Sequence, residues 1–233
     1  MAVYEIAGLR VQMDAFGRTA RQAEPYLSKT SGAVDITLRC DPDALLKHAP
    51  SYGNSDAAFY SGSGAEFARA LLQHGGLQLH ASAVVLEGKA YLFTAPSGTG
   101  KSTHSEKWCR LFGAQLLNDD KPALRCKDGI WSAWGTPWSG KHDLSTPANA
   151  PVAGIAFLER GEENSIRPLE SADAVPYIMS QCVRLLQMEQ MQRQLTLLDS
   201  LLTQVPVWLL KARNDDQAAM VSRAAMEGKP WKR

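Results

Sequence analysis

A glycine-rich stretch, "APSGTGKST" from Ala95 to Thr103, constrains the fold of this 233-residue chain more than any other feature of the sequence. The residues before it, "AYLF", have the apolar character of a buried strand. The residues after it, "STHSEKWCRLF", are typical of a helix, which Gly113 would end. A strand, a loop with G-x-G-K-S and a helix in succession are the pattern of a phosphate-binding loop, the P-loop. The alternative is an ordinary turn before a helix.

The consensus P-loop begins with glycine, where this chain has Ala95. That glycine serves the turn out of the strand, and alanine suffices unless the turn needs a positive φ. Gly98 and Gly100 allow backbone N–H groups to point at one anion. Lys101 would reach the terminal phosphates, and Ser102 would place its hydroxyl on Mg²⁺. The expected nucleotide-binding residues are Ser97, Gly98, Thr99, Gly100, Lys101, Ser102 and Thr103.

Two adjacent carboxylates, Asp119 and Asp120, follow the apolar run "AQLLN". Neighbouring side chains on an extended chain point to opposite sides, so the pair is not expected to share one duty. One carboxylate would bind Mg²⁺ together with Ser102, and the other would act as the base toward a substrate hydroxyl. The spacing does not show which aspartate binds Mg²⁺ and which acts as the base. The alternative is a solvated turn.

A histidine and a proline-rich loop flank these motifs. His80, in "LHAS", precedes the strand pair that leads to the P-loop, and it is either structural or a partner that tunes a catalytic carboxylate. In the loop "GTPWSGK", Lys141 offers a mobile positive charge for the transferred phosphoryl group. Trp138 would stack on a base or fill a contact in the loop, or else be an ordinary buried side chain. His104 is expected to face solvent or the nucleotide.

Composition excludes several function classes. The net charge of +1 and the lack of a long basic run argue against nucleic acid and anionic membranes as partners. No stretch approaches the roughly 18 apolar residues of a membrane helix, and the N-terminus does not resemble a secretory signal. The four cysteines are scattered, which favours a reduced, cytoplasmic protein without a zinc site.

The order of predicted elements indicates an α/β fold with a mixed, largely antiparallel sheet and a helical C-terminal portion. Strands dominate up to residue 169, and a helical pattern runs from 171 to 204. That helical stretch fits a core element, a dimer interface or a docking surface equally well. We expect a small N-terminal α/β portion, residues 1–75, packed on a P-loop domain formed by residues 76–233.

From His80 to Leu169 the chain resembles the catalytic domain of the HPr kinase/phosphorylase family, and most closely its short, single-domain members. The resemblance is carried by "LHASAVVLEGKAYLFTAPSGTGKST", "LLNDDKPALR" and "VAGIAFLER". It implies the fold of the HPr kinase C-terminal domain, which phosphoenolpyruvate carboxykinases share more distantly. Members of the family are often oligomeric, so the resemblance also implies a possible homo-oligomer. Short relatives include kinases of peptides made in biosynthetic clusters.

The resemblance implies transfer of phosphate from ATP, with Mg²⁺, to a serine hydroxyl. His80 and one aspartate of the pair would act together on the proton of that serine. The chain departs from the family in three respects. Residues 1–75 are shorter than the separate N-terminal domain of the full-length bacterial enzymes, a glycine-rich segment with an arginine is not evident, and the C-terminal helical elements differ. Lys141 stands near the place of that arginine and is expected to substitute for it.

The predicted function is therefore an ATP- and Mg²⁺-dependent serine kinase that acts on a protein or peptide. A small-molecule kinase acting on a free hydroxyl compound such as serine is one alternative. A nucleotide-binding regulator without transferase activity is another, although a regulator would have no use for a base at His80 and the aspartate pair.

Overall fold

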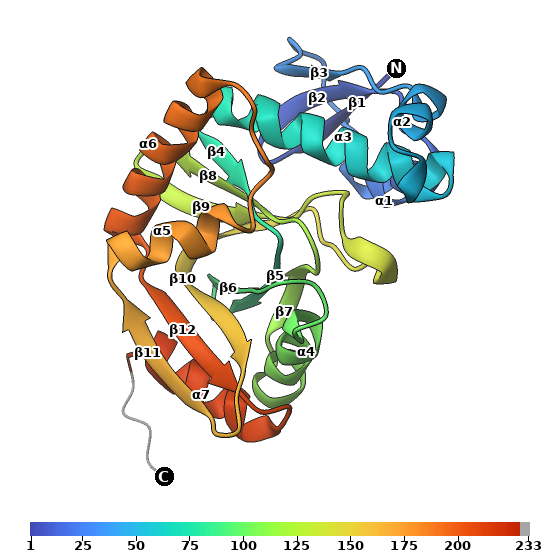
Figure 1. The fold of residues 1–233 in the computed structure, drawn as a ribbon. Coiled ribbons are helices and arrows are strands. Elements are labelled where there is room, and N and C mark those ends of the chain that lie inside the picture. Colours follow the sequence, from blue (N-terminus) through green and yellow to red (C-terminus); the bar gives the residue numbers. More distant parts are fainter. Residues whose placement is uncertain (229–233) are drawn as a thin grey trace.

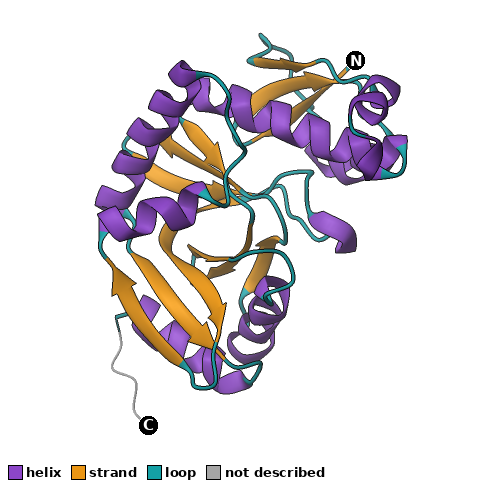
Figure 2. Ribbon diagram, in the orientation of Figure 1, coloured by secondary structure: helices purple, strands orange, loops and turns teal. Residues whose placement is uncertain are grey.

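The structure is a computed structural model that describes residues 1–228, apart from the side chain of Lys141. Within this range the strands form two sheets, one of three strands and one of nine. The smaller sheet and three helices form one end of the molecule, and the larger sheet lies between helices at the other (Figures 1 and 2). None of the helices in the described range combines the length and apolar character that a membrane crossing requires.

The elements have the following bounds. The strands are β1 (Ala2–Ile6), β2 (Leu9–Met13), β3 (Ile36–Leu38), β4 (Gly76–Gln78), β5 (Ala81–Leu86), β6 (Lys89–Thr94), β7 (Gln115–Asn118), β8 (Ala123–Lys127), β9 (Ile130–Trp134), β10 (Asn149–Arg160), β11 (Ser165–Leu169) and β12 (Val207–Ala212). The α-helices are α1 (Gly17–Ala23), α2 (Pro42–His48), α3 (Ser55–Leu71), α4 (Lys101–Phe112), α5 (Ser171–Met179), α6 (Met188–Gln204) and α7 (Asp216–Met226). Short 3₁₀ turns are η1 (Glu24–Tyr26), η2 (Pro50–Tyr52), η3 (Leu72–His74) and η4 (Gly140–His142).

The long strand β10 joins the two halves of the larger sheet. Its first residues pair antiparallel with β9, and its later residues pair parallel with β6 and β12. The other pairs of this sheet in the described residues are antiparallel: β4 with β8, β8 with β9, β5 with β6, β5 with β7, and β11 with β12. The expectation of a mixed, largely antiparallel sheet is therefore confirmed.

Apolar side chains cover both faces of the larger sheet. On one face, Leu198 and Leu201 of α6 and Ile178 of α5 join the core beneath them. On the other face, Trp108 of α4 and Ala219 of α7 pack against apolar residues of strands β5, β6 and β10. Burial of this apolar surface is the main force that holds α4 in place, and α4 in turn positions the glycine-rich loop at its start.

The first 75 residues form a three-stranded sheet covered by helices. β1 pairs antiparallel with β2, and β2 pairs parallel with β3. Phe67 and Leu71 of α3 pack with these strands, and the same cluster takes in Trp138 and Ala123 from later in the chain. The N-terminal portion therefore packs against the larger domain through buried side chains, among them Trp138 in the loop that follows β9.

The helical pattern predicted for residues 171–204 is interrupted. α5 ends at Met179, and α6 begins at Met188. Between them, Cys182 forms an isolated bridge with Leu79, and the backbone carbonyl of Gln181 accepts from the N–H of His80 at 2.8 Å. A continuous helix would use its carbonyls internally, so the break lets this segment pair with the chain on either side of His80.

His104 is a buried residue of α4, so the expectation that it faces solvent is wrong, and the alternative that it lies beside the nucleotide stays a prediction. Its Nε2 lies 2.9 Å from Ser222 Oγ of α7, and its ring meets the edge of Phe93 with centroids 4.6 Å apart. Burial lowers the pKa of His104 to about 3. The side chain is therefore neutral in the folded protein and joins α4 to α7.

Acid is expected to destabilise the protein through this histidine. Below pH 6.5 the unfolded chain binds a proton at His104 that the folded protein excludes until about pH 3. Stability is thus lost as the pH falls, by about 2 kcal/mol at pH 5. Denaturant unfolding at pH 7 and pH 5 should show a smaller loss for His104→Gln than for the wild type. Equal losses in both proteins would refute this assignment.

Candidate functional site

The glycine-rich loop leaves the end of β6 and turns into the start of α4. Gly98 and Gly100 have positive φ values, 79° and 117°, which residues with side chains rarely adopt. A Cβ atom added at either glycine would meet no other atom within 4 Å, so the loop borders open space. Gly100 is the N-cap of α4, and it has no side chain to satisfy the first N–H groups. These groups are available to an anion.

Lys101 is buried at the first position of α4. Its Nζ donates to the backbone carbonyl of Ala95 at 3.1 Å. Burial lowers the pKa of Lys101, while the nearby carboxylates of Asp120 and Asp119 oppose that shift. A phosphate in the loop would offer this ammonium group a charged partner, which makes a stronger hydrogen bond than a neutral carbonyl does.

The side chain of Asn118 shapes the turn that carries the two aspartates. Its Oδ1 accepts from the backbone N–H groups of Asp120 at 2.9 Å and Lys121 at 2.7 Å. Its Nδ2 donates to the carbonyl of Thr136 at 2.9 Å. This buried amide therefore makes an Asx turn directly after β7 and joins it to the loop after β9.

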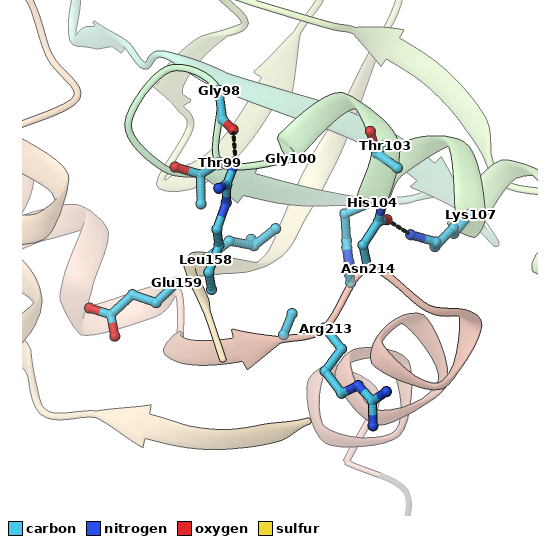
Figure 3. A pocket seen from close by; sticks show the side chains of 12 residues that line it. Gly98, Thr99, Gly100, Thr103, His104, Lys107, Leu158, Glu159, Arg213 and Asn214 are labelled. Atoms are coloured by element: carbon cyan, nitrogen blue, oxygen red, sulfur yellow. Dashed lines mark hydrogen bonds between the residues drawn. The ribbon is translucent and has the colours of Figure 1, made fainter. Parts of the chain in front are cut away.

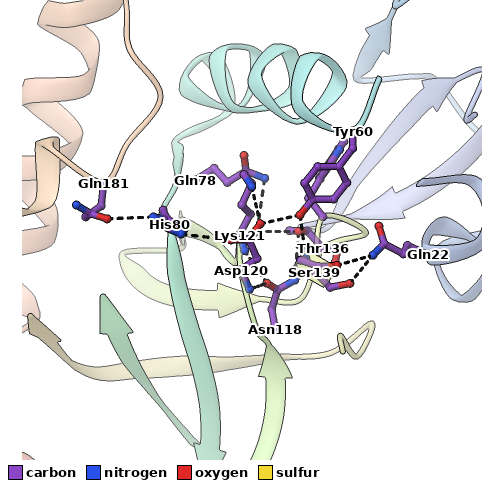
Figure 4. Close-up of polar contacts among 12 residues, drawn as sticks. Gln22, Tyr60, Gln78, His80, Asn118, Asp120, Lys121, Thr136, Ser139 and Gln181 are labelled. Atoms are coloured by element: carbon purple, nitrogen blue, oxygen red, sulfur yellow. Dashed lines mark hydrogen bonds and ion pairs between the residues drawn. The ribbon is translucent and has the colours of Figure 1, made fainter. Parts of the chain in front are cut away.

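Asp120 is the centre of a polar network (Figure 4). Its Oδ2 accepts from the Tyr60 hydroxyl at 2.7 Å and from Lys121 Nζ, and its Oδ1 lies 3.4 Å from Nε2 of His80. Burial raises the pKa of Asp120, but the charge and hydrogen bond of Lys121, with the Tyr60 hydrogen bond, outweigh it and hold the pKa below its ordinary value. The carboxylate is therefore ionised at neutral pH.

Asp119 has a different set of partners. Its Oδ1 accepts from Ser82 Oγ on β5 at 2.9 Å, and its backbone N–H donates to the carbonyl of Leu144 at 3.1 Å. The side chain is 8% exposed and lines a cavity together with Ser102 of α4. The two aspartates thus serve different parts of the site.

His80 lies between Asp120 and the segment after α5. Its Nδ1 is 3.1 Å from Gln181 Oε1, on the side of the ring away from Asp120. Burial lowers the pKa of His80, the charge of Lys101 lowers it further, and Asp120 opposes both. The imidazole is therefore held neutral at pH 7, at hydrogen-bonding range of a carboxylate.

These residues surround one cavity of about 600 Å³. Its lining comprises Arg18, Tyr60, His80, Ser97, Gly98, Gly100, Lys101, Ser102, Thr103, Glu106, Asp119, Asp120, Gly140 and His142. Residues predicted from the sequence for phosphate, metal and base roles are thus brought together in a single space. Thr99 faces elsewhere, and the side chain of Lys141 lies outside the described residues, although its neighbours Gly140 and His142 line the cavity.

A second cavity, of about 460 Å³, lies on the other side of the glycine-rich loop (Figure 3). Gly98, Gly100 and Thr103 line both cavities. The remaining lining is formed by Thr99, His104, Lys107, Leu158, Glu159, Arg160, Ala212, Arg213 and Asn214. Arg160 donates to the carbonyl of Gly98 at 2.8 Å and so braces the loop from the end of β10. The loop is therefore accessible from two directions.

Trp138 does not face either cavity. It is fully buried and stacks on Phe67, with ring centroids 4.8 Å apart, and its Nε1 donates to Ser63 Oγ at 3.1 Å. The suggestion that it stacks on a nucleotide base is therefore wrong. Its large apolar surface is better accommodated in the core between α3 and the proline-rich loop.

Several residues of the site were missed by sequence reasoning. Asn118 and Lys121 flank the aspartate pair, and an asparagine before two turn residues is a recognisable Asx signal. Tyr60, Arg18 and Gln181 carry no such signal, because they lie far from the motifs in sequence. The packing of α1 and α3 brings Arg18 and Tyr60 to the cavity, and the segment after α5 brings Gln181 to His80.

The cavity offers ligands that suit a magnesium ion bound together with phosphates. Among the described residues, no three His, Cys, Asp or Glu side chains come together as a metal cage. Mg²⁺ at phosphate sites needs only one or two protein carboxylates, with phosphate oxygens and water completing its shell. Asp119 and the Ser102 hydroxyl line the same cavity as the glycine-rich loop, and they fit that requirement.

Comparisons with known proteins relate this chain to a family model and to solved structures, of which one is described here. The family model described as "SynChlorMet cassette protein ScmC" matches residues 65–214. The Hpr(Ser) kinase/phosphatase from Coxiella burnetii is 17% identical, with a TM-score of 0.38, over 65% of this chain and 99% of that chain. A TM-score of that size is too low to establish a common fold. No curated protein matches the sequence.

Proposed function

The chain belongs to the family of SynChlorMet cassette protein ScmC, and we propose that it is a kinase that transfers phosphate from ATP to a serine hydroxyl of a protein or peptide. One observation carries the proposal. The glycine-rich loop, with Lys101 and Ser102, opens into the same cavity as His80 and the aspartate pair. Phosphoryl transfer depends on positioning and electrostatics, and these groups are suited to both tasks.

The loop and Lys101 would hold the phosphates of the nucleotide. N–H groups at the start of α4 and the ammonium group of Lys101 are donors aimed at negative charge. The nucleoside would extend into the second cavity, where Lys107 and Asn214 offer polar contacts. Asp119 and Ser102 would hold Mg²⁺, which neutralises charge on the phosphates when it is bound.

Asp120 and His80 would receive the acceptor. The serine oxygen attacks the γ-phosphorus, the bond from that phosphorus to the β,γ-bridging oxygen breaks, and ADP leaves. The proton of the serine hydroxyl passes to the Asp120 carboxylate, which shares it with the neutral imidazole of His80 across 3.4 Å. The role of Lys141 as a cation that steadies the transferred charge stays a prediction.

An apolar recess beside the site favours a peptide or protein acceptor over free serine. The recess measures about 560 Å³ and shares Ser102, Glu106 and Asp119 with the main cavity. Its other lining residues are Cys109, Arg110, Ala114, Leu116 and Leu144. Free serine has no group to fill such a space, whereas a side chain next to the acceptor serine in a peptide would.

Phosphoryl transfer should be retained at neutral pH and decline toward acid, with the midpoint of the decline below pH 6.5. The neutral form of His80 is the active one, and burial lowers its pKa below the ordinary 6.5. Protonation, and with it the loss of activity, is therefore displaced toward acid. The measurement is kcat/KM against pH with Mg·ATP. His80→Asn should be slower at every pH and lack this acid limb; a limb centred above 6.5 in the wild type would contradict the assignment.

Label transfer from γ-³²P-ATP tests the proposal. The acceptors would be a serine-containing peptide library, free serine, and a host-cell lysate fractionated by size. Phosphoserine in peptides or proteins is the expected result. Label in free serine would indicate the small-molecule kinase instead, and tight nucleotide binding without any transfer would indicate a regulator.

A further inference from the structure

We propose that Arg18, from the N-terminal portion of the chain, binds the phosphoryl group on the acceptor side of the cavity. The inference rests on the proposed kinase function and adds a phosphate-binding residue to it. Arg18 lies upstream of residues 65–214, the range that the family model matches. It nevertheless lines the same cavity as Lys101 and Asp120.

The backbone holds Arg18 in a defined place. Asp56, at the start of α3, accepts from the N–H of Arg18 at 2.7 Å. Gly17 has a φ of 55°, and a Cβ there would lie 2.1 Å from Asp56 Oδ1. A side chain at position 17 would displace this carboxylate, and the positive φ also favours glycine. This contact fixes the first turn of α1 against α3 at the edge of the cavity.

An aromatic ring holds the guanidinium group. The Cζ atom of Arg18 lies 4.2 Å from the ring centroid of Tyr60. The hydroxyl of the same tyrosine donates to Asp120 and accepts from the N–H of Gly140 at 2.9 Å. A cation stacked on a ring keeps its N–H donors free at its edge. Tyr60 thus contacts both the guanidinium group of Arg18 and the carboxylate of Asp120 and holds the two groups near each other.

The cations around the cavity differ in their existing partners. Lys101 donates to Ala95, and Lys121 pairs with Asp120. Among the residues that the structure describes, Arg18 forms no ion pair within 4.0 Å, and its guanidinium group makes no hydrogen bond. A planar group with several donors suits the oxygens of a phosphoryl group. Arg18 is therefore the described cation that is best able to bind phosphate beside Tyr60 and Asp120.

The experiment compares Arg18→Ala with Arg21→Ala. Arg21 is the matched control, because it lies in the same helix but is exposed and outside the cavity lining. The first measurement is binding of inorganic phosphate to the Mg·ADP complex, which needs no acceptor. Arg18→Ala should weaken phosphate binding at least 10-fold and leave Mg·ADP binding unchanged, while Arg21→Ala changes neither.

Label transfer from ATP to the peptide library is the second measurement. Loss of one preorganised donor is expected to lower kcat/KM about 100-fold in Arg18→Ala, and added guanidinium ion at a non-denaturing concentration should restore part of it. A merely structural role would instead lower the melting temperature without rescue. If the wild type transfers label and Arg18→Ala matches Arg21→Ala in both measurements, this inference is wrong and the kinase proposal stands. If the wild type transfers no label and binds no phosphate, both fail.

Discussion

Replacing Asp120 with asparagine is expected to lower kcat for phosphoryl transfer by about 10²- to 10⁴-fold, the range typical of a lost general base. The amide oxygen can still accept from the Tyr60 hydroxyl and from Lys121, so the turn and the cavity should persist. What disappears is the negative charge that faces His80 and would receive the serine proton. Binding of Mg·ADP should change little, since the proposed nucleotide site is formed by the glycine-rich loop and the second cavity, which Asp120 does not line.

Asp119→Asn is the matched comparison for that variant. Asp119 lies beside Ser102 and bonds to Ser82, so its loss should raise the Mg²⁺ concentration needed for half-maximal transfer. Excess Mg²⁺ should recover activity in Asp119→Asn and not in Asp120→Asn. Recovery by Mg²⁺ in Asp120→Asn and not in Asp119→Asn would mean that Asp120 binds the metal and Asp119 is the base. Full activity in both variants would show that neither aspartate is the base.

Lys101→Met is expected to lower kcat/KM by about 10²- to 10³-fold, as the loss of one preorganised charged donor does at other sites. Methionine is close to lysine in length and suits the buried position of this side chain, so the fold should survive. Lys89→Met is the control, because Lys89 is an exposed lysine at the start of β6, outside both cavities. Wild-type kcat/KM in Lys101→Met would contradict phosphate binding by the loop.

The local parts of the site could be predicted because each depends on residues close together in sequence. Gly98 and Gly100 adopt the positive φ values that a phosphate loop requires, and Gly113 ends α4 in the left-handed conformation. In each case, backbone geometry and nearby donors decide the outcome.

The rest of the site depends on contacts between residues far apart in the chain, and such contacts leave no periodic pattern in the sequence. Tyr60 reaches Asp120 from a helix 60 residues earlier, and Gln181 reaches His80 across 101 residues. The break between α5 and α6 follows from that pairing, since the local pattern between them reads as helix. The sequence left open whether Trp138 stacks on a base or is buried for the same reason: nothing local shows that Phe67 stacks on it.

The central claim is that the loop before α4 binds nucleotide phosphates. The most direct test is an NMR titration of ¹⁵N-labelled protein with ADP and Mg²⁺, followed at the backbone amides of Gly98, Gly100 and Lys101. The account predicts large, saturable shifts at these amides in the wild type, and much weaker binding in Lys101→Met. Saturable binding that leaves all three amides unmoved, or no binding at millimolar ADP, would contradict it.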